Sequence, residues 1–113
     1  MTARAFRTIA LAQPQAVEGS HMGHADFRVG GKVFASLGPD EDWGMVKLGP
    51  DDQADLIDED AAVYRPAAGA SGVRGSTIIL LREADARRVT RAISAAWRNV
   101  APPRLARQSG KGD

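Results

Sequence analysis

The sequence contains no cysteine, so disulfide bonds, thiolate nucleophiles and cysteine-based zinc sites are excluded. Aromatic residues make up only 5% of the chain: three Phe, two Trp and one Tyr. We expect Trp43 and Trp97 to lie in the core, which disfavours recognition of single strands by base stacking. No apolar run reaches the roughly 20 residues of a membrane span, and residues 6–12 are too polar for a signal peptide. We therefore expect a cytoplasmic protein without membrane contact.

The total charge is also small, with 15 basic and 14 acidic side chains and a net charge of +1. Its distribution is uneven. Residues 39–60 hold nine acidic side chains against Lys47 alone, whereas residues 61–113 hold ten basic side chains against three acidic ones. A chain polarised in this way can present a basic face to an anionic partner, although two solvated surfaces of unlike sign would give the same pattern.

What the sequence does contain is the pattern of one small α+β domain of 113 residues. Apolar spacing, capping residues and prolines predict helices over 2–13, 49–60 and 83–100. Period-two alternation predicts strands within 16–22, 26–29, 32–37, 43–48, 63–65 and 76–82. The predicted order is α-β-β-β-β-α-β-β-α, an antiparallel sheet with helices mainly on one face. Residues 1–103 form the predicted domain, and residues 104–113 a disordered basic tail.

The hairpin at Gly30-Gly31 allows two registers. A two-residue turn would set Phe27 opposite Phe34 and mix the two faces of the sheet. A three-residue loop, which we prefer, gathers one apolar face from Ala25, Phe27, Val33, Ala35 and Leu37. It leaves four side chains off the core side: Asp26, Arg28, Lys32 and Phe34.

The segment HMGHAD holds one weak candidate metal site, formed by His21, His24 and Asp26. On a single strand His24 and Asp26 share a face and His21 points away, unless a turn at Gly23 intervenes. Solvated or hydrogen-bonded histidines at a strand edge are the favoured interpretation, and we expect no metal.

Residues 67–75 are rich in Gly and Ala and are predicted to form a flexible hairpin tip. Residues 72–75, Gly-Val-Arg-Gly, resemble a GxxG clamp for nucleic-acid backbone, but that clamp joins two helices and here a strand follows. A phosphate loop would likewise need a helix directly after it. No Ser-His-Asp order or carboxylate pair indicates a catalytic site, so we expect no enzymatic activity and no cofactor.

Four segments together resemble the MmcQ/YjbR family: GSHMGHADFRVGGKVFASLG, WGMVKLGPDDQADL, VYRPAAGASGVRGSTIILL and AISAAWRNVAP. The resemblance covers roughly residues 5–102, and its most specific parts are DFRVGGKVFA, VKL and the Ala-Trp-Arg near the end of the last helix. It implies a two-layer sandwich similar to secretion chaperones, and DNA binding through paired hairpins that form a double wing. Many relatives carry a Trp in the Gly-rich loop where this chain has Ser71, so a role for an aromatic side chain at the loop tip is not expected.

The resemblance and the basic residues together predict a monomeric DNA-binding protein that contacts phosphates. The candidate DNA-binding residues are Arg28, Lys32, Arg65 and Arg74 on the hairpins and Arg87 and Arg91 on the last helix. The alternative is a non-enzymatic module that binds a protein or peptide. Clustering of the basic side chains on one surface would favour DNA, whereas scatter, or pairing with the acids of residues 51–60, would favour the alternative.

Overall fold

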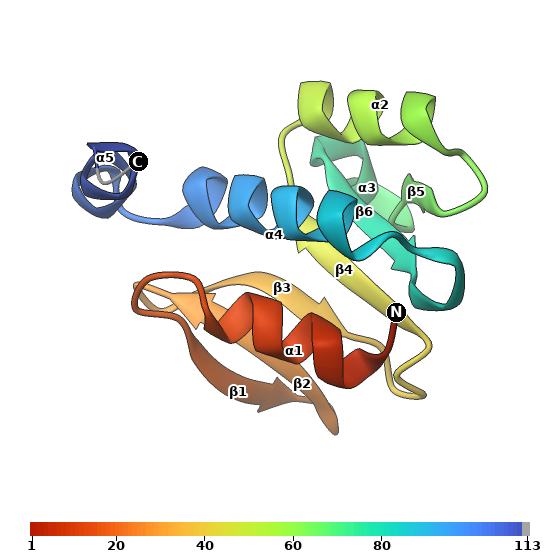
Figure 1. The fold of residues 1–113 in the computed structure, drawn as a ribbon, viewed down its shortest axis with the longest axis horizontal. Helices are drawn as coiled ribbons and strands as arrows, with labels where there is room; N and C mark the ends of the chain where they lie inside the picture. The colour runs from red at the N-terminus through yellow and green to blue at the C-terminus, as the bar shows by residue number, and fades with distance from the viewer. Residues whose placement is uncertain (112–113) are drawn as a thin grey trace.

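The computed structural model describes the backbone of residues 1–111 and the side chains of residues 1–107. It is an α+β structure in which helices pack mainly on one face of an antiparallel sheet (Figure 1). The predicted fold class is confirmed. The elements are α1 (Ala3–Leu11), β1 (Val17–His21), β2 (His24–Val29), β3 (Lys32–Leu37), β4 (Trp43–Lys47), α2 (Pro50–Glu59), β5 (Tyr64–Pro66), α3 (Gly69–Arg74), β6 (Ser76–Leu80), a 3₁₀ turn (Leu81–Glu83), α4 (Ala86–Val100) and α5 (Pro103–Lys111).

The six strands form one sheet in the order β1-β2-β3-β4-β6-β5, so β1 and β5 are its edges. All five pairings are antiparallel. α1 and α4 contact each other and lie across one face, and α4 packs on the central strands β3 and β4. β6 is an inner strand, between β4 and the edge strand β5, which agrees with its uninterrupted apolar sequence.

The core lies between this face and the two helices. Phe27, Ala35, Val46 and Thr77 are cross-strand partners in one row, and all four are buried. The largest side chains that complete the core are Phe6 from α1 and Trp97 from α4. The expected core position of Trp97 is therefore confirmed, whereas Trp43 is only half-buried.

The predicted three-residue loop of the β2–β3 hairpin is wrong, but the pairing that it was meant to give, with Phe27 and Ala35 on one face, is present. The turn is the two-residue Gly30-Gly31 turn, with Val29 opposite Lys32, and both glycines have positive φ. A β-bulge then shifts the pairing, so that Phe27 lies opposite Ala35 and not opposite Phe34. The extra residue lets Phe34 be fully buried, where the preferred register had placed it outside the core.

Two segments predicted to lack regular structure are helical. α3 replaces the predicted flexible tip and joins β5 to β6, and its C-terminal Gly75 has a φ of 123°. The part of the predicted disordered tail from residue 104 to residue 111 belongs to α5, and residues 112–113 lie outside the described part of the chain. None of the helices within residues 1–111 is long and apolar enough to span a membrane.

Candidate functional site

The face of the sheet opposite α1 and α4, called the open face here, carries one row of side chains that crosses all six strands. Its members, in sheet order, are direct cross-strand partners: Gly19, Asp26, Ser36, Met45, Ile78 and Arg65. Side chains alternate along each strand, so these residues share the face that the core row does not use. The row has no side chain on β1, where Gly19 lies, is polar on β2 and β3, apolar on β4 and β6, and cationic at the β5 edge.

The apolar part of the open face is concave. A hollow of about 670 Å³, called the open-face hollow here, lies over β4, β6 and β5. Its floor includes Trp43, Met45 and Ile78, and its polar lining residues are His24, Ser36 and Arg65. The flat Trp43 ring lies against Gly38, where a Cβ atom would overlap it. Glycine at this position therefore leaves the space that the indole occupies beside the hollow.

The polar part of the open face holds an ion pair between the buried Asp26 carboxylate and the partly exposed Arg28 side chain. The Arg28 guanidinium donates to both carboxylate oxygens of Asp26, with Nε 2.8 Å from Oδ1 and Nη2 3.0 Å from Oδ2. These hydrogen bonds lower the pKa of Asp26 below its ordinary value of 3.8, although burial acts in the opposite direction. They also raise the pKa of Arg28. Gly19 makes room for the pair, because a Cβ there would lie 2.9 Å from Oδ1 of Asp26.

The candidate metal ligands do come together on one face. The turn at Met22-Gly23 sets His21 opposite His24, with their ring centroids 6.5 Å apart. Both oxygens of Asp26, however, are held by Arg28. In the described part of the chain no group of three or more His, Cys, Asp or Glu side chains is placed to hold a metal ion.

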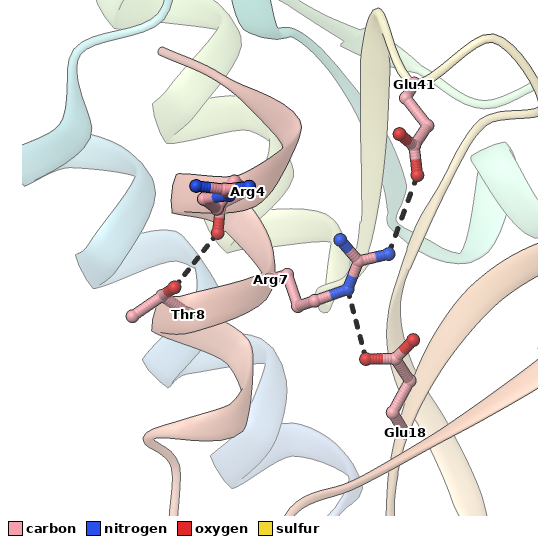
Figure 2. A network of polar contacts seen from close by, with 5 residues as sticks. All are labelled: Arg4, Arg7, Thr8, Glu18 and Glu41. Carbon is pink, nitrogen blue, oxygen red and sulfur yellow. Dashed lines mark hydrogen bonds and ion pairs between the residues drawn. The ribbon is translucent and has the colours of Figure 1, made fainter.

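Several basic side chains are paired with acids inside the molecule. Figure 2 shows Arg7 of α1 between Glu18 of β1 and Glu41 of the β3–β4 loop, at 3.1 and 3.5 Å. Arg88 of α4 lies 4.0 Å from Glu59 of α2. These pairs are half-exposed and contribute little to stability, but they reduce the positive charge that a partner would meet.

The groove between α2 and α4 brings further opposite charges together. Asp52, Asp55 and Glu59 line one side of it, and Arg88 and Arg91 line the other. Asp51 and Asp52 also lie in the first turn of α2, where they compensate its dipole, as their spacing predicted. Arg91 therefore faces acidic side chains and not an open basic surface.

One group of cations lies in hollows that no acidic side chain lines. Two adjoining hollows share Lys47, Asn99 and Val100, and add Lys32 on one side and Arg74 on the other, with no acidic lining residue. Lys32, Lys47 and Arg74, called the basic surface here, are all exposed and form no ion pair within residues 1–107. Asn99 donates to the carbonyl of Lys47 at 2.9 Å, which fixes the end of α4 on β4.

The predicted DNA-binding residues therefore separate into different environments. Lys32 and Arg74 come together, and they are joined by Lys47, which the sequence reasoning missed although it is the one base among nine acids in residues 39–60. Arg28 is bound to Asp26, and Arg65 lines the open-face hollow. Arg87 is exposed in the first turn of α4, and Arg91 lines the α2–α4 groove.

The fold and its open face define a small α+β domain built on a six-stranded antiparallel sheet. A family model described as YjbR matches residues 11–99, which is most of the chain, and the chain belongs to this family. The crystal structure of the Deinococcus radiodurans protein DR2400, which has a DUF419 domain, is similar in fold, with a TM-score of 0.73 at 15% identity. The match covers 87% of this chain and 77% of that chain. No curated protein matches the sequence.

Proposed function

We propose that this YjbR-family chain binds double-stranded DNA through the basic surface, by contacts to phosphates and not to base edges. The observation that carries the proposal is the convergence of Lys32, Lys47 and Arg74 without an acidic side chain among them. Contacts from lysine and arginine to phosphates give affinity and position a protein on the duplex without reading sequence.

Neighbouring elements support this location. The ring of Pro102 lies against Gly30, since a Cβ at Gly30 would be 3.0 Å from Cγ of Pro102. α5 therefore starts beside the turn that precedes Lys32, and it adds the exposed Arg104 and Arg107 near the same end of α4 (Figure 1). The C-terminal end of a helix such as α4 carries a negative partial charge, which stabilises cations gathered around it.

The proposed interface differs from the double wing that the family resemblance implies, in which two hairpins contact DNA. Arg28 on the first hairpin is neutralised by Asp26, and β5 and β6 are joined by α3 and not by a tight turn. Only the tip of the β2–β3 hairpin, through Lys32, and the end of α3, through Arg74, contribute to the interface together with Lys47 of β4. The proposed function involves no catalysis.

The test is binding of a labelled duplex as a function of salt concentration. The variant Lys32→Ala/Lys47→Ala/Arg74→Ala removes the basic surface. The control Arg82→Ala/Arg87→Ala/Arg91→Ala removes the same charge from exposed positions elsewhere. The log-log slope changes by about 0.9 for each phosphate neutralised, so the first variant is expected to lower it by up to about 2.7. The control is expected to keep the wild-type slope.

Either of two results would overturn the proposal. Equal loss of slope in both variants would show that total charge, and not this surface, governs binding. Absence of binding at low salt, where electrostatic attraction is strongest, would remove DNA as the partner and leave a protein- or peptide-binding role as the function to test.

A further inference from the structure

The open-face hollow is not used by the proposed DNA interface. Its volume of about 670 Å³ lies within the range of about 300–1,000 Å³ found for small-molecule sites. Trp43, Met45 and Ile78 give it a floor that is mostly apolar, and all three side chains remain partly accessible. Exposed apolar side chains gathered in a concave site are the ordinary setting for a ligand with an apolar body.

The floor has a specific shape and chemistry. The Trp43 indole offers a flat face for stacking, and the Met45 thioether adds a polarisable contact that favours aromatic rings. Met45 and Ile78 are direct cross-strand partners, so their side chains lie next to each other. A planar aromatic ring fits this floor better than a branched aliphatic group does, because stacking needs two flat faces.

The margin of the hollow is cationic. Arg65 lies directly opposite Ile78 on the edge strand β5, is exposed, and forms no ion pair within residues 1–107. The Asp26 carboxylate on the same face is already bound by Arg28, so it does not neutralise Arg65. The guanidinium of Arg65 is therefore free to bind a carboxylate through two parallel hydrogen bonds.

A second polar group at the margin has no partner. Nδ1 of His24 is buried and makes no hydrogen bond in the structure. A buried nitrogen without a hydrogen-bond partner is unfavourable. His24 lines the hollow, so a rotation of its ring towards a bound anion would satisfy this atom.

We propose that the open-face hollow binds a small aromatic carboxylate, with the ring on Trp43 and Met45 and the carboxylate on Arg65. The site is separate from the basic surface, since the two sets of lining residues share no member. This inference is independent of DNA binding.

The test uses two probes that differ only in charge, indole-3-acetate and its neutral amide, indole-3-acetamide. Their binding to the full chain is followed by NMR through the Trp43 indole N–H and the Met45 methyl group, and by calorimetry. Indole-3-acetate is expected to bind about tenfold more tightly than the amide, because a charge-assisted bidentate contact is stronger than a neutral one. Both reporter signals are expected to shift with the same dissociation constant.

The variant Arg65→Gln is expected to remove this preference and to reduce the affinity for indole-3-acetate to that of the amide. Arg82→Gln, at an exposed arginine outside the hollow, is the matched control and is expected to keep the preference. Equal binding of the two probes by the wild type, an unchanged preference in Arg65→Gln, or the absence of shifts at Trp43 and Met45 would each overturn the inference. Duplex binding, measured on the same variants, is expected to be unaffected by Arg65→Gln.

Discussion

Gly44 of β4 lies under the ring of Phe6 from α1, at the point where the helix meets the sheet. A Cβ at Gly44 would be 2.7 Å from Cε2 and 2.9 Å from Cζ of Phe6, closer than real Cβ contacts allow. Phe6 is fully buried, so its ring cannot move into solvent. We predict that Gly44→Ala destabilises the protein by forcing α1 or the ring to shift.

The size of the effect follows from two opposing terms. Overpacking a filled core costs about 1–3 kcal/mol, whereas replacing glycine by alanine in a strand returns about 0.5–1 kcal/mol of backbone entropy. The difference lies between about 0 and 2.5 kcal/mol, so the expected loss in the free energy of unfolding, from the middle of each range, is about 1 kcal/mol. For a domain of this size that corresponds to a fall of about 5 °C in the melting temperature.

Urea unfolding of wild type, Gly44→Ala, Phe6→Leu and the double variant measures the contact directly. Leucine lacks the ring atoms nearest to Gly44, so Gly44→Ala is expected to become neutral or stabilising in the Phe6→Leu background. The expected coupling energy is about 1–2 kcal/mol, within the range for residues in contact. If Gly44→Ala costs the same in both backgrounds, the contact with Phe6 is not the cause and the reasoning is refuted.

Two further predictions concern hydrogen bonds to single partners. Arg28→Gln is expected to raise the pKa of Asp26, as an NMR titration would show. Because the pKa of Asp26 is lowered in the folded protein, the ion pair stabilises the fold above pH 3.8. This stability is lost as the pH falls through the lowered pKa of the folded state. The difference in the free energy of urea unfolding between wild type and Arg28→Gln should therefore shrink in acid. A difference independent of pH would contradict this linkage. Trp97→Phe removes the hydrogen bond of 2.9 Å from the indole to the carbonyl of Pro14, with an expected cost of about 1–3 kcal/mol. Unfolding followed by circular dichroism measures it, and unchanged stability would show that the bond contributes nothing.

Local signals in the sequence predicted much of the fold because the structure uses them locally. Thr2 accepts a hydrogen bond from the Ala5 N–H at 3.1 Å, as its N-cap position predicted. Pro50 begins α2, as predicted, whereas α4 begins at Ala86, capped by Asp85 through the Arg87 N–H, and not at residue 83 as predicted. These features depend on residues within one turn of the chain, so no knowledge of the tertiary structure was needed to place them.

The errors concern features that depend on distant parts of the chain. The bulge that buries Phe34 is set by the fit of the strand under the helices, and alternation alone cannot reveal it. α3 is held from outside, since Gln53 of α2 donates to the carbonyls of Gly72 and Ser76, both at 2.9 Å. Glycines that disfavour an isolated helix are tolerated there because α2 provides these bonds.

The candidate site was predicted only in part for the same reason. The sequence shows which residues carry charge, but pairing decides which charges stay available. Arg28 is bound to Asp26 two residues away, whereas Lys47 is exposed beside Arg74, 27 positions further along the chain. Neither fact follows from composition. The Asp26–Arg28 pair depends on the geometry of side chains on a strand, and the closeness of Lys47 to Arg74 depends on the order of strands in the sheet.

The two edges of the sheet offer different opportunities for contact with another chain. β5 is three residues long and ends in Pro66, which has no N–H to donate, so a further strand finds few partners there. β1 is five residues long, contains no proline and is largely exposed. An added strand would therefore extend the sheet along β1 and not along β5. Two copies joined in this way would end at their β5 edges, so the assembly would close as a pair and not grow into a fibre.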